Sequence, residues 1–457
     1  MNDTIAAIAT ALAPSAIGIL RLSGPESVAV LDRVFTPAHG GPMSGRPDHT
    51  LVYGTLTDPE GQAIDYCLAT VSRAPHSYTG EDTAELQCHG SPAALVLGLE
   101  ALFAAGARQA QAGEFTRRAF LAGKLDLTRT EAIADLIHAE SPAAVRQAAG
   151  QLGGALARVI EEIYQSLTDL MAHFHAVLDY PDEDIEPFQA AEISSTLAAA
   201  AAKLDRLAGS YRRGRALMEG VPCAIIGRPN AGKSTLFNAL LGYDRAIVTP
   251  IAGTTRDTVE ERLNLGGVLL RLIDTAGLRD ADDQVEQLGV ERSRAAVEQA
   301  ELVLVVLDGS RNLTQEDRDA LDLGLSAPRC AVILNKDDLP GQEGPQLPKL
   351  PPQVPVVRLS ALTGEGVDQL ELAMENLFPD DSGMRPGALL TNARQVQAAQ
   401  QARQAVSQAA QALQNGMPPD AVLSDVEQAL AALGELTGRV VREDVTARIF
   451  ERFCVGK

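Results

Sequence analysis

The chain has 457 residues, of which 46% are hydrophobic and 22% are charged, and both proportions are ordinary for a globular protein. Because this length exceeds what one hydrophobic core usually serves, we expect two or three domains. The net charge of -21 argues against a protein that grips nucleic acid or anionic lipid through its overall electrostatic field.

Cysteine usage and hydropathy suggest where the protein works. The five cysteines form no C-x-x-C pair and match no zinc-binding spacing, so the sequence predicts neither a disulfide framework nor a metal knuckle. Residues 1–13 carry no Lys or Arg, and no apolar run approaches ~20 residues, so we expect neither a signal peptide nor a membrane span. These features favour a cytoplasmic protein with no membrane partner.

Short runs with strand-like composition recur between Ile17 and Ser91, separated by Gly, Pro, Asp and Ser. They are AIGILRLS, HTLVYGTL, AIDYCLATVS and AELQCHG. From about Phe120 the apolar spacing becomes helical. One long amphipathic stripe is predicted from Leu156, Val159, Ile160, Ile163, Leu167, Leu170, Met171, Phe174, Val177 and Leu178.

Apolar runs alternate with longer helical patterns between Val221 and Leu359, which is typical of βαβ units with a parallel sheet covered on both faces. These runs are CAII, LLRLI, LVLVVL, CAVIL and PVVRL. A breaker-rich stretch from Pro379 to Gly387 follows. Helical spacing then resumes at Val396, Val406, Leu413, Val422, Val426, Leu430 and Leu433.

These patterns together predict a multidomain protein of the α/β and all-α class. We expect a mixed α/β domain at residues 1–118 and a helical domain in two parts, 119–217 and 381–457. An α/β domain with a mostly parallel sheet, residues 218–380, is inserted between those parts. Insertion is the economical interpretation because two separate helical pieces would each bury less apolar surface.

The run from Gly227 to Thr235 fits G-x-x-x-x-G-K-[ST] in the strand-to-helix context that a phosphate-binding loop requires. Its glycines allow backbone N–H groups to approach phosphates, and the helix start adds positive potential. We expect Lys233 to reach the β and γ oxygens and the Ser234 hydroxyl to hold Mg²⁺. The remaining predicted loop contacts are Asn230, Ala231, Gly232 and Thr235.

Further motifs follow in the order expected of a GTP site. After LLRLI, Asp274 provides a carboxylate near the magnesium shell, and Gly277 an amide that can sense the γ-phosphate; Thr275 and Ala276 lie between them. After CAVIL, Asp338 can accept two hydrogen bonds from guanine that adenine cannot offer. The rest of the predicted base pocket comprises Asn335, Lys336, Ser360, Ala361 and Leu362.

A candidate switch loop, TPIAGTTRD, starts at Thr249, and its Thr255 can complete the magnesium shell. Leu278 follows Gly277, at the position where many GTPases carry the Gln that orients the attacking water. Another group must therefore position this water and supply positive charge.

With these motifs, four further segments resemble the MnmE (also called TrmE) family of tRNA modification GTPases. The segments are GEDTAELQ at 80–87, GEFTRRAF at 113–120, GKLDL at 123–127 and FCVGK at 453–457. The resemblance covers the whole chain in the expected order. It implies a folate-binding, dimerising N-terminal domain, a discontinuous helical domain, and an inserted GTPase domain that pairs with its twin across a homodimer.

The resemblance also implies roles for individual residues. K⁺ would be held by the Asn230 side chain with backbone oxygens near Thr249, Ile251 and Thr254, and would supply the charge of an arginine finger. Glu286 matches the residue that positions the attacking water.

A tetrahydrofolate derivative, either 5-formyl or 5,10-methylene, is a further implied ligand. It would contact Arg21, Glu85, Lys124 and Lys457, while Cys454 would be a catalytic or structural terminus. Without the resemblance, each of these charged residues would more often be an ordinary surface charge.

The implied activity is potassium-stimulated GTP hydrolysis in a heterotetramer with a flavin- and NADH-dependent partner. It would control addition of a carboxymethylaminomethyl or aminomethyl group at carbon 5 of the wobble uridine in tRNA. A basic partner would then provide much of the RNA contact, helped by Arg212, Arg213 and Arg215 of this acidic chain. Alternatives are an Era-like ribosome-assembly GTPase without group transfer and a regulatory switch that binds only protein partners.

Overall fold

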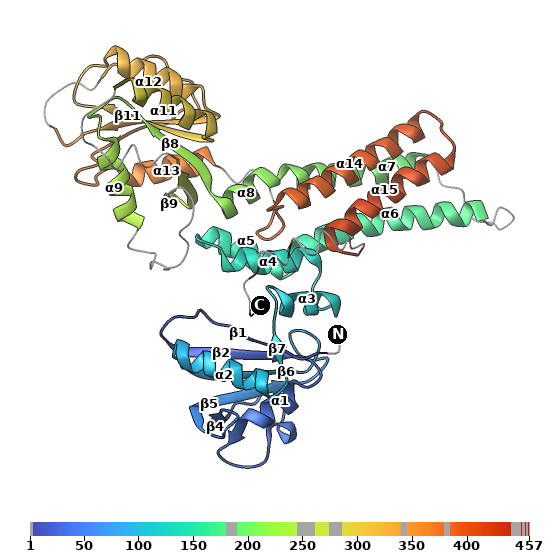
Figure 1. Ribbon diagram of the computed structural model, residues 1–457. Coiled ribbons are helices and arrows are strands. Elements are labelled where there is room, and N and C mark those ends of the chain that lie inside the picture. The colour runs from blue at the N-terminus through green and yellow to red at the C-terminus, as the bar shows by residue number, and fades with distance from the viewer. Residues whose placement is uncertain are drawn as a thin grey trace. The chain divides into compact units, whose positions relative to one another are not determined.

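The computed structural model describes residues 3–179, 190–244, 261–273, 286–339, 345–378 and 384–439, and positions 449, 453 and 456 (Figure 1). The chain forms two compact units. Unit 1 contains residues 1–137, 151–200 and 401–457, and unit 2 contains residues 138–150 and 201–400. Three of these boundaries fall within helices α5 (Pro142–Leu152), α7 (Ala190–Gly209) and α14 (Ala393–Gln414), which therefore contribute to both units.

Unit 1 contains a seven-stranded sheet with strand order β3-β4-β5-β6-β2-β1-β7. All neighbours are antiparallel except β1 and β7. The strands are β1 (Ile5–Ile8), β2 (Ser15–Ser23), β3 (Phe35–Pro37), β4 (Val52–Thr57), β5 (Ala63–Ser72), β6 (Thr83–Gly90) and β7 (Arg108–Gln109). The four strand-like runs of the sequence are confirmed as β2, β4, β5 and β6.

Helices α1 (Ser27–Val34) and α2 (Pro92–Ala104) pack on this sheet and share its core (Figure 1). Alternation along β2 buries Leu20 and Leu22 in that core. The chain turns into α2 at Ser91, whose side chain accepts a hydrogen bond from the Ala94 N–H. A short 3₁₀ helix, η1 (Met43–Gly45), also contacts α1. The N-terminal region is the mixed α/β structure that its sequence predicts.

Further helices lie along the chain between the two sheets of the protein and after the second sheet. They are α3 (Glu114–Leu121), α4 (Leu127–Ile137), α5 (Pro142–Leu152), α6 (Ala155–Asp179), α7, α8 (Tyr211–Glu219), α14 and α15 (Pro419–Thr437). The predicted stripe lies on α6, which packs on α15. Six members of the stripe are buried: Leu156, Ile160, Ile163, Leu167, Leu170 and Phe174.

Unit 2 contains a six-stranded sheet with strand order β13-β12-β11-β8-β10-β9. Only the edge pair β9–β10 is antiparallel. The strands are β8 (Val221–Ile226), β9 (Glu261–Leu265), β10 (Val268–Leu272), β11 (Leu302–Asp308), β12 (Arg329–Asn335) and β13 (Val356–Leu359). The predicted mostly parallel sheet is confirmed.

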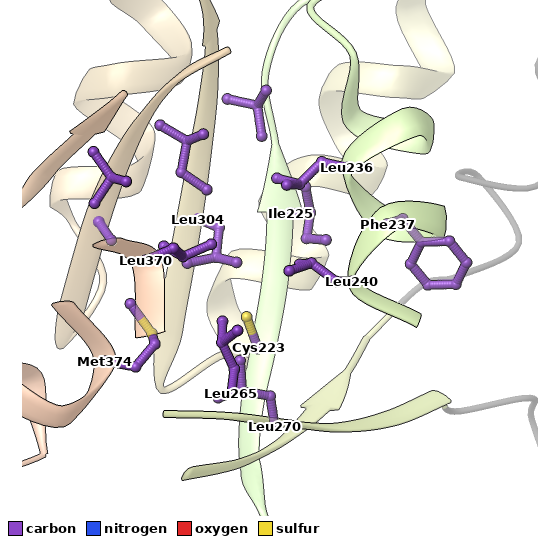
Figure 2. Close-up of a cluster of buried hydrophobic side chains, with 14 of the residues drawn as sticks. Cys223, Ile225, Leu236, Phe237, Leu240, Leu265, Leu270, Leu304, Leu370 and Met374 are labelled. Atoms are coloured by element: carbon purple, nitrogen blue, oxygen red, sulfur yellow. The ribbon is translucent and has the colours of Figure 1, made fainter. Parts of the chain in front are cut away.

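Helices cover both faces of this sheet, so its strands are apolar on both sides. Residues of α9 (Lys233–Asp244) and α13 (Val367–Leu377) pack on one face, where Cys223, Ile225, Leu236, Leu370 and Met374 share a core (Figure 2). Residues of α11 (Glu286–Gln299) and α12 (Gln315–Leu325) pack on the other face.

The chain segments before and after this α/β region meet within unit 2. The Leu390 N–H donates to Ser210 Oγ at 3.1 Å across 180 positions of sequence. The Gln147 side chain donates to the Leu389 carbonyl at 3.1 Å and accepts from the Gly387 N–H at 2.7 Å. These contacts join the two segments that flank the α/β region.

The predicted division into segments 1–118, 119–217, 218–380 and 381–457 remains a prediction. Among the described residues, no helix is long and apolar enough to cross a membrane.

Candidate nucleotide-binding site

The phosphate-binding loop connects the end of β8 to the start of α9. Gly227, Asn230 and Gly232 have φ values of 150°, 60° and 97°. A Cβ atom added to Gly232 would lie 2.1 Å from Asn335 Nδ2. This position therefore requires glycine both for its backbone conformation and for the close approach of a neighbouring side chain.

Lys233 is the first residue of α9, and its side chain folds over the loop. Its ammonium donates to the Gly227 carbonyl at 2.8 Å and to the Arg228 carbonyl at 2.9 Å. Burial, together with the charge of Arg228, lowers the pKa of Lys233. Ser234 is half-buried and Thr235 is exposed in the same first turn. The loop thus holds a partly desolvated cation whose partners among the described residues are two carbonyls, which an anion can replace.

Asn335, at the end of β12, connects three predicted motifs. Its side chain donates to the Ala231 carbonyl at 3.0 Å and accepts from the Ala361 N–H at 2.9 Å. The residue is only 2% exposed. One buried amide therefore joins the phosphate loop, the N-K-x-D motif and the segment after β13.

The predicted base pocket follows the carboxyl ends of β12 and β13. Lys336 has a φ of 71°, and Asp338 is exposed beyond it. Ser360 is buried, and its hydroxyl accepts from the Thr363 N–H at 3.2 Å. Leu362 is 78% exposed and Ala361 is 5% exposed. The structure brings these segments together at one sheet edge, with the Asp338 carboxylate open to a ligand.

Asp308, which ends β11, was not predicted as part of the site. Its carboxylate pairs with Lys336 at 2.9 Å, Arg311 at 2.8 Å and Arg228 at 3.5 Å. It also accepts from the Ser310 N–H and hydroxyl. Although burial opposes ionisation, these hydrogen bonds and charges hold the pKa of Asp308 well below its ordinary range. The carboxylate thus links the phosphate loop to the base-binding motif.

Several predicted site residues lie outside the described residues, namely Thr249, Ile251, Thr254, Thr255, Asp274, Thr275, Ala276 and Gly277. Glu286 is described only as the start of α11. The switch, most of the magnesium shell and the potassium ligands other than Asn230 therefore remain predictions.

The predicted folate residues lie in unit 1. Arg21 on β2 and Glu85 on β6 are cross-strand partners, with Nε and Oε1 2.7 Å apart. The Arg21 guanidinium lies 5.8 Å from the centre of the Phe115 ring and donates to the Gly456 carbonyl at 3.3 Å. Arg21 and Glu85 are thus brought together beside the C-terminal segment.

Of the other residues predicted for this site, the structure describes Lys124. Lys124 donates to the Pro75 carbonyl. Cys454 and Lys457 lie outside the described residues, although Gly456 between them is described.

Comparison with known proteins covers the whole chain. The family model described as the MnmE helical domain matches residues 127–454, and the one described as the GTP-binding protein TrmE N-terminus matches residues 4–124. The protein named tRNA modification GTPase MnmE of Symbiobacterium thermophilum is 45% identical, with 100% of both chains covered. The one of Moorella thermoacetica is 41% identical, also with 100% of both covered.

A solved structure of Era from Aquifex aeolicus bound to GDP.AlF4- matches a smaller part. It is 27% identical, covers 40% of this chain and 65% of that one, and has a TM-score of 0.25. The two relatives described above, which match this chain over its full length, are both named tRNA modification GTPase MnmE. The chain therefore belongs to the MnmE family.

Proposed function

We propose that this chain is a GTP hydrolase that acts in tRNA wobble uridine modification. The observation that carries the proposal is the Asn335 junction, which assembles the phosphate loop and the base-binding motif in a chain 45% identical over its full length to a tRNA modification GTPase. The Era-like alternative is weaker because the full-length relatives do not carry that name.

Binding of GTP would begin with exchange of partners at Lys233. The Lys233 ammonium is already partly buried and donates to two loop carbonyls. The phosphates can replace these carbonyls as its partners without removing a further positive charge from water. Ser234, beside it, and Thr255 in the switch would hold Mg²⁺, with Asp274 in the surrounding shell. Asp338 would select guanine through its two hydrogen bonds.

Hydrolysis would need Glu286 to position the attacking water and K⁺ to stabilise negative charge in the transition state. The ion would be held by Asn230, Thr249, Ile251 and Thr254. Support for this part comes from family membership and from the left-handed, exposed conformation of Asn230.

The N-terminal domain of a homodimer would bind a tetrahydrofolate derivative at Arg21, Glu85, Lys124 and Lys457. The flavin- and NADH-dependent partner would form a heterotetramer with this dimer and share the contact with tRNA. Pairing and separation of GTPase domains would then control chemistry at the folate site, with Cys454 close to it.

The first experiment is mass spectrometry of tRNA nucleosides from a strain that lacks the gene. The wild type should restore the wobble uridine modification, whereas Lys233→Ala should not. Lys349→Ala, which changes an exposed lysine of the same unit, is the matched control and should restore it. Unchanged nucleosides together with unassembled ribosomal subunits would favour the Era-like alternative and remove the basis for a folate site.

Two assays on purified protein separate the finer parts of the proposal. Glu286→Ala should bind GTP normally and hydrolyse it much more slowly, with K⁺ compared against Na⁺ in the same assay. Full hydrolysis by this variant would rule out the water-positioning role.

Equilibrium dialysis against 5-formyl-tetrahydrofolate tests the second site. Wild type should bind, and Arg21→Ala should bind much more weakly. Absence of binding to the wild type would favour a regulatory switch that uses protein partners alone.

A further inference from the structure

Two cysteines far apart in sequence lie side by side in the sheet of unit 1. The antiparallel register pairs Leu68 of β5 with Gln87 of β6, so its continuation places Cys67 opposite Cys88. Asp65 precedes Cys67 by two positions, and strand alternation puts both side chains on one face. None of these three residues, Cys67, Cys88 and Asp65, belongs to the nucleotide site or to the predicted folate site.

The three side chains converge on one point. The two Sγ atoms and a carboxylate oxygen of Asp65 all lie within 4.8 Å of one another. Both cysteines are 3% exposed, and the Asp65 side chain is 10% exposed. Among the residues that the structure describes, this is the one group of three such ligands.

Hydrogen bonds fix the orientation of the Asp65 carboxylate. Oδ1 accepts from the Tyr66 N–H at 2.8 Å and is 2.8 Å from His89 Nδ1. Oδ2 accepts from the His89 N–H at 2.8 Å. Outer hydrogen bonds of this kind orient the first ligands in metal sites. The His89 side chain is 75% exposed and so marks the solvent side of the group.

We propose that Cys67, Cys88 and Asp65 form a Zn²⁺ site. Zn²⁺ prefers thiolate, imidazole and carboxylate ligands in tetrahedral geometry, with bonds of about 2.0–2.3 Å. Such bonds require ligand atoms about 3.5–3.8 Å apart, so atoms that now lie within 4.8 Å of one another need to approach by about 1.3 Å at most. Binding forms two Zn–S bonds and one Zn–O bond and releases two thiol protons to solvent. A fourth ligand, such as a water molecule, would complete the tetrahedron.

Cobalt substitution tests the site in the full-length chain. The experiment uses reduced protein carrying Cys454→Ser, which removes the terminal thiol. Co²⁺ should bind once per chain with a thiolate-to-cobalt charge-transfer band, and Zn²⁺ should abolish that band. Cys67→Ser and Cys88→Ser should each weaken binding at least tenfold, and Asp65→Asn should do the same while leaving both thiols in place.

Cys223→Ser and Cys330→Ser are the matched controls, because both cysteines are buried elsewhere in the fold. They should bind Co²⁺ as the parent chain does. A missing band, or one that survives Cys67→Ser and Cys88→Ser, would overturn the site.

A second measurement needs no variant that could misfold. Zn²⁺ should slow alkylation of Cys67 and Cys88 in the wild type by at least tenfold, and that of Cys330 should not change. Mass spectrometry of the alkylated peptides measures each rate. Equal alkylation of Cys67 and Cys88 with and without Zn²⁺ would contradict the proposal.

Discussion

Replacing Asn335 with alanine should disconnect the phosphate loop from the base-binding motif. The substitution leaves the buried Ala231 carbonyl and the buried Ala361 N–H without the partners they have at 3.0 and 2.9 Å. Each lost partner costs about 1–3 kcal/mol when the remaining group stays buried. We therefore expect unit 2 to lose roughly 2–6 kcal/mol of unfolding free energy.

Nucleotide affinity should fall with it, because the loop loses its fixed position against the guanine-binding segment. A free-energy loss of about 1.4 kcal/mol corresponds to a tenfold weaker complex. Chemical denaturation measures the stability change, and titration with a fluorescent GDP analogue measures the dissociation constant. We expect the affinity to fall at least tenfold.

Asp337→Ala is the matched control in the same motif. The Asp337 side chain is 50% exposed, and its ion pair with Arg358 spans 3.4 Å. Exposed pairs of this kind contribute about 0–1 kcal/mol. If Asn335→Ala changed stability and affinity no more than Asp337→Ala does, the role of Asn335 as a structural junction would be refuted.

Four further substitutions test the nucleotide site and an ion-pair cluster of unit 1. Gly232→Ala should destabilise unit 2 by about 1–3 kcal/mol in thermal unfolding because of its positive φ and its crowded Cβ position. By contrast, Gly242→Ala in open space on α9 should stabilise it by up to about 1 kcal/mol. Asp308→Asn should cost roughly 1–3 kcal/mol in denaturant titration, because Lys336, Arg311 and Arg228 lose a charged hydrogen-bond partner that is itself buried, and an unchanged midpoint would contradict that. Burial opposes ionisation of Glu114, yet its arginine hydrogen bonds lower its pKa below the ordinary 4.5. The stability that this carboxylate adds is therefore complete above that value and is lost as the pH falls through the lowered one, so Glu114→Gln should flatten the acid side of a melting-temperature profile.

Local sequence patterns were sufficient for most of the fold. Alternation identified β2, β4, β5 and β6, and the two-sided apolar runs identified β8, β10, β11, β12 and β13 of unit 2, whereas the edge strand β9 was not predicted. Both patterns arise because each strand residue is apolar where its own side chain faces a core. They can therefore be recognised without knowing which strands are neighbours. The phosphate loop was recognisable for a similar reason, since its requirements lie within nine consecutive positions.

The contacts that sequence could not show depend on register and on distant partners. Asp308 is a single carboxylate at the end of an apolar strand, and two of its three cationic partners, Arg228 and Lys336, come from other segments of the chain. Cys67 and Cys88 match no zinc-binding spacing because strand pairing, rather than a short loop, brings them together. Such sites become visible only when the order of strands is known.

The packing of α6 on α15 has a consequence for synthesis of the chain. Glu161 of α6 is paired with Arg439, which also lies 4.3 Å from the centre of the Tyr164 ring, and 278 positions separate the paired residues. At about 5–20 residues per second, a ribosome takes roughly 14–56 s to cover that distance. During this time the apolar stripe of α6 has no α15 to cover it, while the inserted unit can already fold. Nascent chains halted before Pro419 should therefore bind chaperones that recognise exposed apolar surface.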